Sequence, residues 1–367
     1  MRLLVPCILF GLLSACSGAS ERAPATEATT AAPALETEPP PEAGEQSTLS
    51  EALADEVEEL GEADRAAAVA ELRRLPPLGQ ARRGFRTQLR FEPGPGTPPE
   101  APPRDVFELV RYPAPLGPSP AYVSVLPASA RNTKKAAIVW IIGGFDFGIS
   151  SYAWEPQPRE NDQTAAAFRE AGMVLMLPAL RGFSGAPGRP ECFLGEVEDI
   201  LAAGRYLASR PEVDPARVYL GGHSTGGTLA MLASESQLEA GPFKAVFAFG
   251  PVDDPRGYGG MCPPADLPDE SYETLLRAPF VWAANLGAPT WIVEGESGNA
   301  DARELLRQVA GRAPLRTTIV PGAGHFDVLR PASELLARQL LAGTPEDPLA
   351  AVDLSESAIL AAMQASR

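Results

Sequence analysis

The sequence contains only two histidines and four cysteines among its 367 residues, so side chains that commonly bind transition metals are scarce. Neither Cys192 nor Cys262 has a second Cys or a His at ligand spacing, and no metal site and no cofactor are therefore predicted. No apolar run reaches the roughly 18 residues that a membrane span requires. The formal charge of −16 argues against a nucleic-acid partner, because phosphate binding calls for a basic face.

The N-terminus indicates export. A positive start, Met1-Arg2, precedes a short apolar segment over residues 3–13 that ends near small side chains, as in a signal peptide. The letters Leu-Ser-Ala-Cys that end at Cys16 resemble a bacterial lipobox. This resemblance implies that residues 1–15 are removed and that Cys16 is lipidated, which anchors the protein to a membrane of a bacterial cell envelope. An ordinary signal peptide cut nearby would also export the chain.

Composition divides the mature chain into three parts. Residues 16–104 indicate a disordered tether, with an acidic helical stretch over 48–75 and a linker rich in Pro, Gly and Arg over 76–104. Residues 105–343 contain the patterned, core-forming part of the chain. Residues 344–367 add a tail with one short helix.

Strand-like and helix-like runs alternate after residue 105, which predicts an α/β fold whose mostly parallel sheet has helices on both faces. Residues 136–142 (AAIVWII) are apolar throughout, as expected of a strand buried on both sides. The eight predicted strands are residues 106–111, 121–126, 136–142, 173–177, 218–220, 245–249, 290–294 and 316–320. The main predicted helices are residues 162–171, 196–208, 271–277, 301–310 and 332–341, with a helix-compatible run directly after residue 224.

A glycine-rich turn follows the predicted strand at 218–220. It contains Gly222-x-Ser224-x-Gly226, the pattern of a nucleophile elbow between a strand and a helix. A serine on such a strained turn needs glycines two residues before and after it, since a Cβ atom there would clash. Ser224 is therefore the candidate nucleophile.

A serine nucleophile needs a general base and an oxyanion hole. His223 adjoins the serine and is expected to point away from its oxygen, so His325, in the loop after the last predicted strand, is the candidate base. The order of serine before histidine is that of α/β-hydrolases. The predicted oxyanion donors are the N–H of Thr225 and an N–H from Gly144-Phe145, which follows the buried strand.

The acid that would orient His325 is expected in the loop after the strand at 290–294. Hydrolases of this type usually have Asp three residues after the loop glycine, where this sequence has Gly298. Asp301 is the first candidate, although it also fits a helix cap. Glu296, and Asp253 or its neighbour Asp254 after the preceding strand, are the alternatives.

Cys192 and Cys262 are the two thiols left in the predicted mature chain. Both fall in loops expected at the same edge of the sheet, and an exported protein can keep a disulfide. Their pairing is a hypothesis, because spacing in the sequence does not give the distance between Cα atoms.

Residues 107–341 resemble the α/β-hydrolase catalytic domain of the prolyl oligopeptidase (peptidase S9) type. The resemblance implies Ser224 as nucleophile, His325 as base and a covalent acyl-enzyme hydrolysed by water. The residues before Asp105 are too few for that family's N-terminal propeller, so proline specificity is not implied. The stretches that carry the resemblance are residues 140–145 (WIIGGF), 180–185 (LRGFSG), 196–200 (EVEDI), 215–224 (PARVYLGGHS) and 324–326 (GHF).

The sequence thus predicts a cofactor-independent serine hydrolase that acts on peptides. A carboxylesterase acting on small acyl esters is an alternative, because His before the nucleophile is also common among lipases and esterases. A catalytically silent envelope lipoprotein that uses the fold for binding is a second alternative, motivated by the altered acid position at Gly298.

Overall fold

The computed structural model describes residues 61–365 apart from residue 95 and the segments 128–132, 238–240, 259–261, 263–270 and 300–302. The predicted signal peptide, Cys16 and the part of the acidic helical stretch before residue 61 lie outside the described residues, as does Asp301. Within these ranges, no helix has the length and apolar character needed to cross a membrane.

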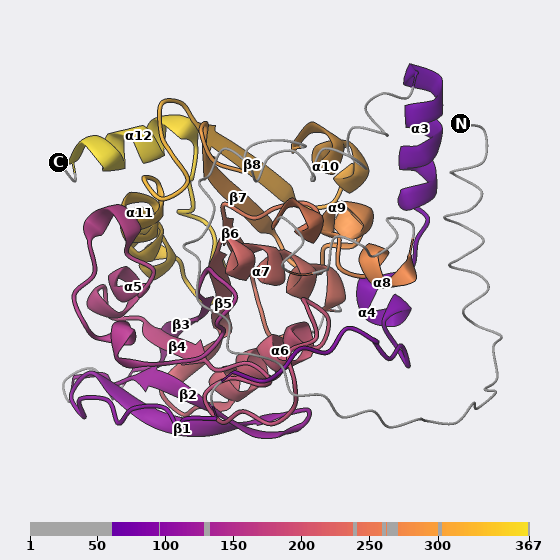
Figure 1. Ribbon diagram of the computed structural model, residues 1–367. Helices are drawn as coiled ribbons and strands as arrows, with labels where there is room; N and C mark the ends of the chain where they lie inside the picture. Colours follow the sequence, from indigo (N-terminus) through magenta and orange to yellow (C-terminus); the bar gives the residue numbers. More distant parts are fainter. Residues whose placement is uncertain are drawn as a thin grey trace, which may run out of the picture.

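One eight-stranded sheet runs through the centre of the molecule in the order β1-β2-β4-β3-β5-β6-β7-β8 (Figure 1). β1 pairs with β2, and β2 with β4, in antiparallel fashion, whereas all other neighbours are parallel. The predicted fold class is therefore confirmed. The strands are β1 (Phe107–Ala114), β2 (Gly117–Ser124), β3 (Lys135–Ile141), β4 (Val174–Pro178), β5 (Val213–His223), β6 (Val246–Phe249), β7 (Thr290–Gly295) and β8 (Leu315–Val320).

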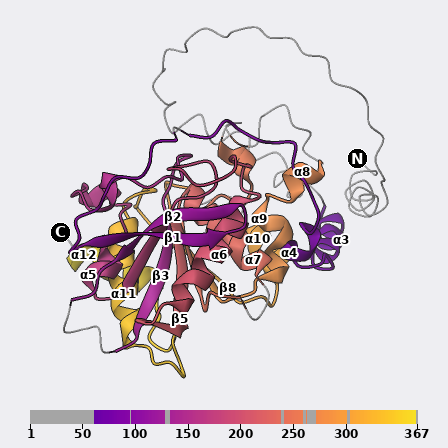
Figure 2. The same ribbon diagram turned by 90° about the horizontal axis from the view of Figure 1, so that it is seen from below.

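Helices cover both faces of this sheet because alternate strand residues point in opposite directions. In β3, Val139 contributes to the core under α6, α7, α9 and α10, while its neighbours Ile138 and Trp140 contribute to the core under α5, α11 and α12. Figures 1 and 2 show these two helical layers on either side of the strands. The helices are α5 (Ala166–Glu170), α6 (Glu196–Ser209), α7 (Thr225–Ser236), α8 (Tyr272–Leu275), α9 (Pro279–Trp282), α10 (Arg303–Ala310), α11 (Leu329–Ala342) and α12 (Glu356–Ala365).

The segment expected to be a linker packs on the domain instead. After α3 (Glu62–Leu72), residues 76–91 form a strap that includes the short helix α4 (Leu78–Ala81). Leu78 is fully buried, and the backbone of Gly79 lies so close to the end of α7 that an added Cβ would be 2.4 Å from the carbonyl oxygen of Ser236. Apolar contact and close backbone approach therefore hold the strap against α7.

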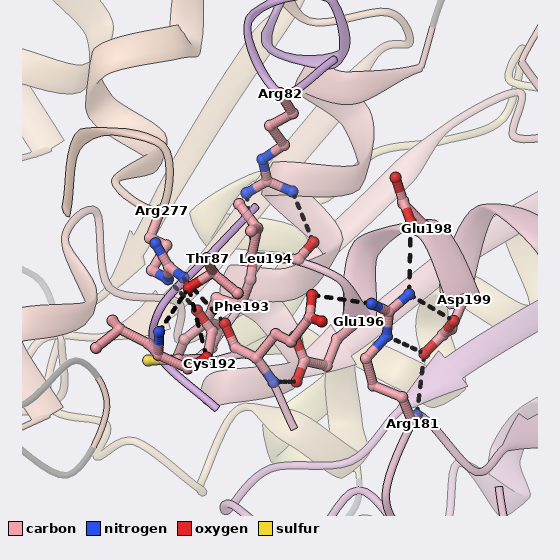
Figure 3. A network of polar contacts seen from close by, with 12 residues as sticks. Arg82, Thr87, Arg181, Cys192, Phe193, Leu194, Glu196, Glu198, Asp199 and Arg277 are labelled. Atoms are coloured by element: carbon pink, nitrogen blue, oxygen red, sulfur yellow. Dashed lines mark hydrogen bonds and ion pairs between the residues drawn. The ribbon is translucent and has the colours of Figure 1, made fainter. Parts of the chain in front are cut away.

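Two arginines, the half-buried Arg82 and the buried Arg277, join the strap to loops of the domain (Figure 3). The guanidinium of Arg82 donates to the carbonyl oxygens of Phe193 at 3.0 Å and Leu194 at 3.1 Å. Arg277 donates to the carbonyl oxygen of Cys192 at 2.6 Å and to the hydroxyl of Thr87, in the strap, at 2.8 Å. Burial lowers the pKa of Arg82 to about 9, a value at which the group still carries its charge at neutral pH.

A disulfide joins the same loop to the segment after β6. Cys192 and Cys262 are bonded, with their Cα atoms 5.5 Å apart. The pairing hypothesised from the sequence is thus present, and it ties residue 192 to the segment that follows β6.

Candidate active site

Ser224 lies at the junction of β5 and α7, at the carboxyl edge of the sheet. Its backbone has φ 53° and ψ −120°, a conformation that is unfavourable for a residue with a Cβ atom. A Cβ added to Gly222 would lie 2.3 Å from the carbonyl oxygen of Gly226, and one added to Gly226 would lie 2.2 Å from that of Ile141. Both glycines are therefore required by close backbone contact, as the elbow pattern predicts.

His325 lies in the loop after β8 and makes a hydrogen bond to Glu294, at the end of β7. Its Nδ1 is 2.9 Å from Oε2 of the Glu294 carboxylate, whose side chain is fully buried. Because the carboxylate accepts, Nδ1 carries the proton of the neutral ring and Nε2 keeps a lone pair. The ring of His325 lies 4.5 Å, centroid to centroid, from that of His223, the residue that precedes Ser224.

The Glu294 carboxylate is held in place by the backbone that follows it. The N–H of Gly295 donates to Oε1 at 2.7 Å, and the N–H of Asn299 donates to Oε2 at 2.9 Å. Gly250 makes room on the other side, since an added Cβ would lie 2.4 Å from Cε1 of His325 and 2.7 Å from Glu294 Oε2. The carboxylate thus has one fixed orientation toward the imidazole.

The carboxylate that contacts His325 differs from the candidates that the sequence suggested. Glu296 is exposed and accepts instead from the N–H of Gly322 at 2.9 Å. Asp253 is buried in the segment after β6, and its neighbour Asp254 pairs with Arg256. Asp301 lies outside the described residues. Glu294, which the sequence places inside a strand, makes the hydrogen bond to the imidazole.

Gly298 leaves room for the carboxylate of Glu294 at the end of β7. A Cβ added to Gly298 would lie 2.6 Å from the carboxyl carbon of Glu294. An aspartate at the position usual for such hydrolases would therefore collide with Glu294, and the glycine leaves the space that the Glu294 carboxylate fills. The one available signal in the sequence was an acidic residue at the carboxyl end of an otherwise apolar strand, where parallel sheets place their binding groups.

The loop after β3 approaches the start of α7, as expected for an oxyanion hole. The hydroxyl of Thr225 donates to the carbonyl oxygen of Gly144, which has φ +87°. Within the described part of the chain, the N–H groups of Gly144 and Phe145 have no hydrogen-bond partner. The first N–H groups of α7 also point away from the helix, so the two segments offer donors to an anion.

Aromatic rings cover one side of this loop. The ring of Phe145 lies 5.6 Å from that of Tyr258 and 6.3 Å from that of Phe193, and Phe193 stacks on Tyr258 at 5.9 Å. Phe193 has φ 63° and follows the disulfide-bonded Cys192. Arg82, Arg277 and the disulfide hold the backbone around Phe193. They therefore help to fix the position of this cluster of aromatic rings.

No group of three or more His, Cys, Asp or Glu side chains within the described ranges is arranged to hold a metal ion. The groups gathered at the carboxyl edge of the sheet are instead a serine on a strained turn, an imidazole bound to a carboxylate and a set of backbone donors. Together they are suited to nucleophilic attack by an oxygen on an acyl carbon.

Comparison with known proteins agrees with this arrangement. Residues 162–262, which include Ser224, match the family model of the prolyl oligopeptidase family. An uncharacterized protein of Mycobacterium tuberculosis is 28% identical over 236 residues, which cover 60% of this chain and 80% of that protein. The uncharacterized peptidase YtmA of Bacillus subtilis is 32% identical over 146 residues, which cover 35% of this chain and 53% of YtmA.

Among solved structures, a puromycin-hydrolyzing peptidase of Mycobacterium tuberculosis superposes with a TM-score of 0.50 at 19% identity. The matched region is 65% of this chain and 39% of the peptidase, so the chain spans well under half of that protein. At this identity the likeness concerns the fold. The chain therefore has an α/β fold like that of this peptidase, and its residues 162–262 are similar to the prolyl oligopeptidase family.

Proposed function

We propose that this protein is a serine hydrolase that cleaves peptide bonds through an acyl-enzyme. The observation that carries the proposal is the Glu294–His325 hydrogen bond beside the strained elbow of Ser224. The missing acid was the reason to consider a catalytically silent protein, and the Glu294 carboxylate beside His325 supports the enzyme instead. The family match over residues 162–262 supports a peptidase.

In the proposed reaction, Oγ of Ser224 attacks the substrate carbonyl while Nε2 of His325 takes the hydroxyl proton. Glu294 holds the Nδ1–H tautomer and stabilises the imidazolium that forms. The N–H groups of Thr225 and of the Gly144-Phe145 loop bind the oxyanion. His325 then protonates the leaving group, and water, activated in the same way, releases the acyl group from Ser224.

A fluorophosphonate probe tests this proposal. The probe is expected to modify the purified wild-type protein, and peptide mapping is expected to find the adduct on Ser224, because only an activated serine reacts readily. The same protein is expected to release p-nitroaniline from acylated peptide anilides. An adduct on another residue, or no reaction, contradicts the serine hydrolase. Turnover of the matched p-nitrophenyl ester without turnover of the anilide would favour the carboxylesterase alternative.

We also propose that the protein is exported and held at a membrane of the cell envelope by lipid on Cys16. The Cys192–Cys262 disulfide supports an oxidising compartment outside the cytoplasm. Cells fed radioactive palmitate are expected to label the wild-type protein and not the Cys16→Ser variant, and only the wild type should enter the detergent phase on Triton X-114 partition. Equal labelling of both proteins, or of neither, contradicts the anchor.

A further inference from the structure

The second histidine lies between the two loops that the proposed reaction requires. His223 is fully buried, and its Nε2 is 3.3 Å from the carbonyl oxygen of His325. Its Nδ1 is 3.3 Å from Oε1 of Gln163, in the segment before α5. The ring also lies 5.2 Å from that of Phe326. His223 thus contacts the base loop on one side and Gln163 on the other.

Gln163 continues this contact to the oxyanion loop. Its Oε1 accepts from the N–H of Gly143 at 2.8 Å, directly before Gly144. Its Nε2 donates to Oδ1 of Asn161 at 3.1 Å, which fixes which end of the amide faces Gly143. A Cβ added to Gly143 would lie 2.7 Å from Gln163 Oε1 and 3.1 Å from His223 Nδ1. Gly143, Gln163 and His223 are therefore closely packed.

The proton on His223 determines which of its contacts is a hydrogen bond. Burial, together with the nearby His325, lowers the pKa of His223 to about 3, so the ring is neutral at pH 7 and has one N–H. Both ring nitrogens face oxygen acceptors, Gln163 Oε1 and the His325 carbonyl. The Nδ1–H tautomer therefore binds Gln163, whereas the Nε2–H tautomer binds the base loop.

We propose that Gln163 and His223 are positioning residues that hold the oxyanion loop and the base loop in a fixed relation to each other. Gln163 orients the peptide unit at Gly143, and hence the donors of Gly144 and Phe145. His223 acts from behind the elbow through the Nε2–H tautomer, which donates to the carbonyl oxygen of His325, while its Nδ1 side packs against Gln163 and Gly143. The inference rests on the proposed hydrolase function, because it assigns these residues a role in oxyanion binding. Neither side chain is proposed to exchange a proton with substrate.

The Gln163→Met variant tests this role, since methionine has a similar length and offers no amide acceptor to Gly143. An oxyanion forms only after attack, so loss of its donors should lower kcat rather than substrate binding. We expect kcat to fall by about 10- to 100-fold, with KM within about threefold of wild type. The inhibition constant of a peptide boronic acid, whose adduct carries an oxyanion-like oxygen, should rise by the same factor as kcat/KM falls.

Variants of His223 separate its two contacts. Asparagine can place an amide N–H near Nδ1, glutamine can place one near Nε2, and phenylalanine keeps the ring but removes both. His223→Gln is expected to retain at least fivefold more kcat than His223→Phe, and His223→Asn is expected to resemble His223→Phe. Gln157→Met is the matched control, because Gln157 donates to the nearby carbonyl oxygen of Glu155 in an exposed hydrogen bond.

Wild-type kcat and boronate inhibition in Gln163→Met, in a protein with an unchanged melting temperature, would overturn the proposal. A rise in KM alone would also overturn it, because it would indicate a substrate-contacting role. If Gln163→Met does not fold, the ranking of the three His223 variants decides the question, and equal activities would refute the inference. A wild-type protein that neither reacts with the fluorophosphonate nor turns over substrate would remove the proposed function and this inference together.

Discussion

Replacement of Glu294 by glutamine is expected to lower kcat by about 10³- to 10⁴-fold, as loss of the acid does in other serine hydrolases. The amide is nearly the same size, but it is neutral and cannot stabilise the imidazolium. It also cannot satisfy all the donors around the carboxylate, because its NH₂ group must face the N–H of Gly295, that of Asn299, or His325. Steady-state kinetics with an acyl ester measures the loss.

Glu296→Gln is the matched control for this variant. Glu296 lies two residues further along the chain, but its carboxylate is exposed and accepts from the backbone N–H of Gly322 rather than contacting His325. Its replacement is expected to change kcat by less than about threefold. A larger loss in Glu296→Gln than in Glu294→Gln would contradict the assignment of the acid.

The space between Glu294 and Gly298 allows a stricter version of this experiment. Glu294→Ala vacates the volume that a side chain at residue 298 would enter. Adding Gly298→Asp to Glu294→Ala restores a carboxylate at the position usual for such hydrolases. The double variant is expected to recover at least about tenfold in kcat relative to Glu294→Ala alone. Gly298→Asp in the wild-type background should instead be destabilised by the collision.

Replacement of Ser224 by alanine is expected to lower kcat by about 10⁶-fold, and to abolish modification by the fluorophosphonate. Alanine has no nucleophilic oxygen, and the oxyanion donors and substrate contacts that remain supply only residual acceleration. Alanine also carries the same Cβ atom as serine, so the cost of the positive φ at this turn is nearly unchanged. The melting temperature should therefore stay close to that of wild type.

Ser236→Ala, at the other end of α7, is the control and is expected to keep wild-type turnover and labelling. Single-turnover measurements at high enzyme concentration give the residual rate of Ser224→Ala above the uncatalysed reaction. Activity within about 100-fold of wild type in Ser224→Ala would show that another residue attacks the substrate.

The parts of the site that were predictable from the sequence are those set by local backbone geometry. Gly222 and Gly226 are constrained by the turn that Ser224 occupies, so their spacing appears directly in the sequence. The buried strands were predictable for a similar reason, because a strand covered on both faces is apolar throughout. His325 followed by elimination, since the chain has one other histidine and that residue adjoins the nucleophile.

Glu294 and Gln163 depend on contacts between distant segments and could not be found in this way. The Glu294 carboxylate keeps its orientation because the chain turns at Gly298, so that the N–H of Asn299 donates to it. Gln163 is separated from Gly143 by 20 residues and from His223 by 60. The strap was assigned as a linker because it is rich in Pro, Gly and Arg. Its Arg82 binds carbonyl groups of the domain, and such binding produces no hydrophobic periodicity.

The arginine contacts of the strap also determine which segments of the chain must be kept together in a shortened protein. A chain shortened to begin at Asp105 would lose Arg82, and the carbonyl groups of Phe193 and Leu194 would lose their donor. Arg277 would remain buried without Thr87. Because unpaired buried polar groups are costly, removal of the strap should destabilise the domain. The structural unit therefore begins before the first strand, in a segment whose composition suggests a spacer.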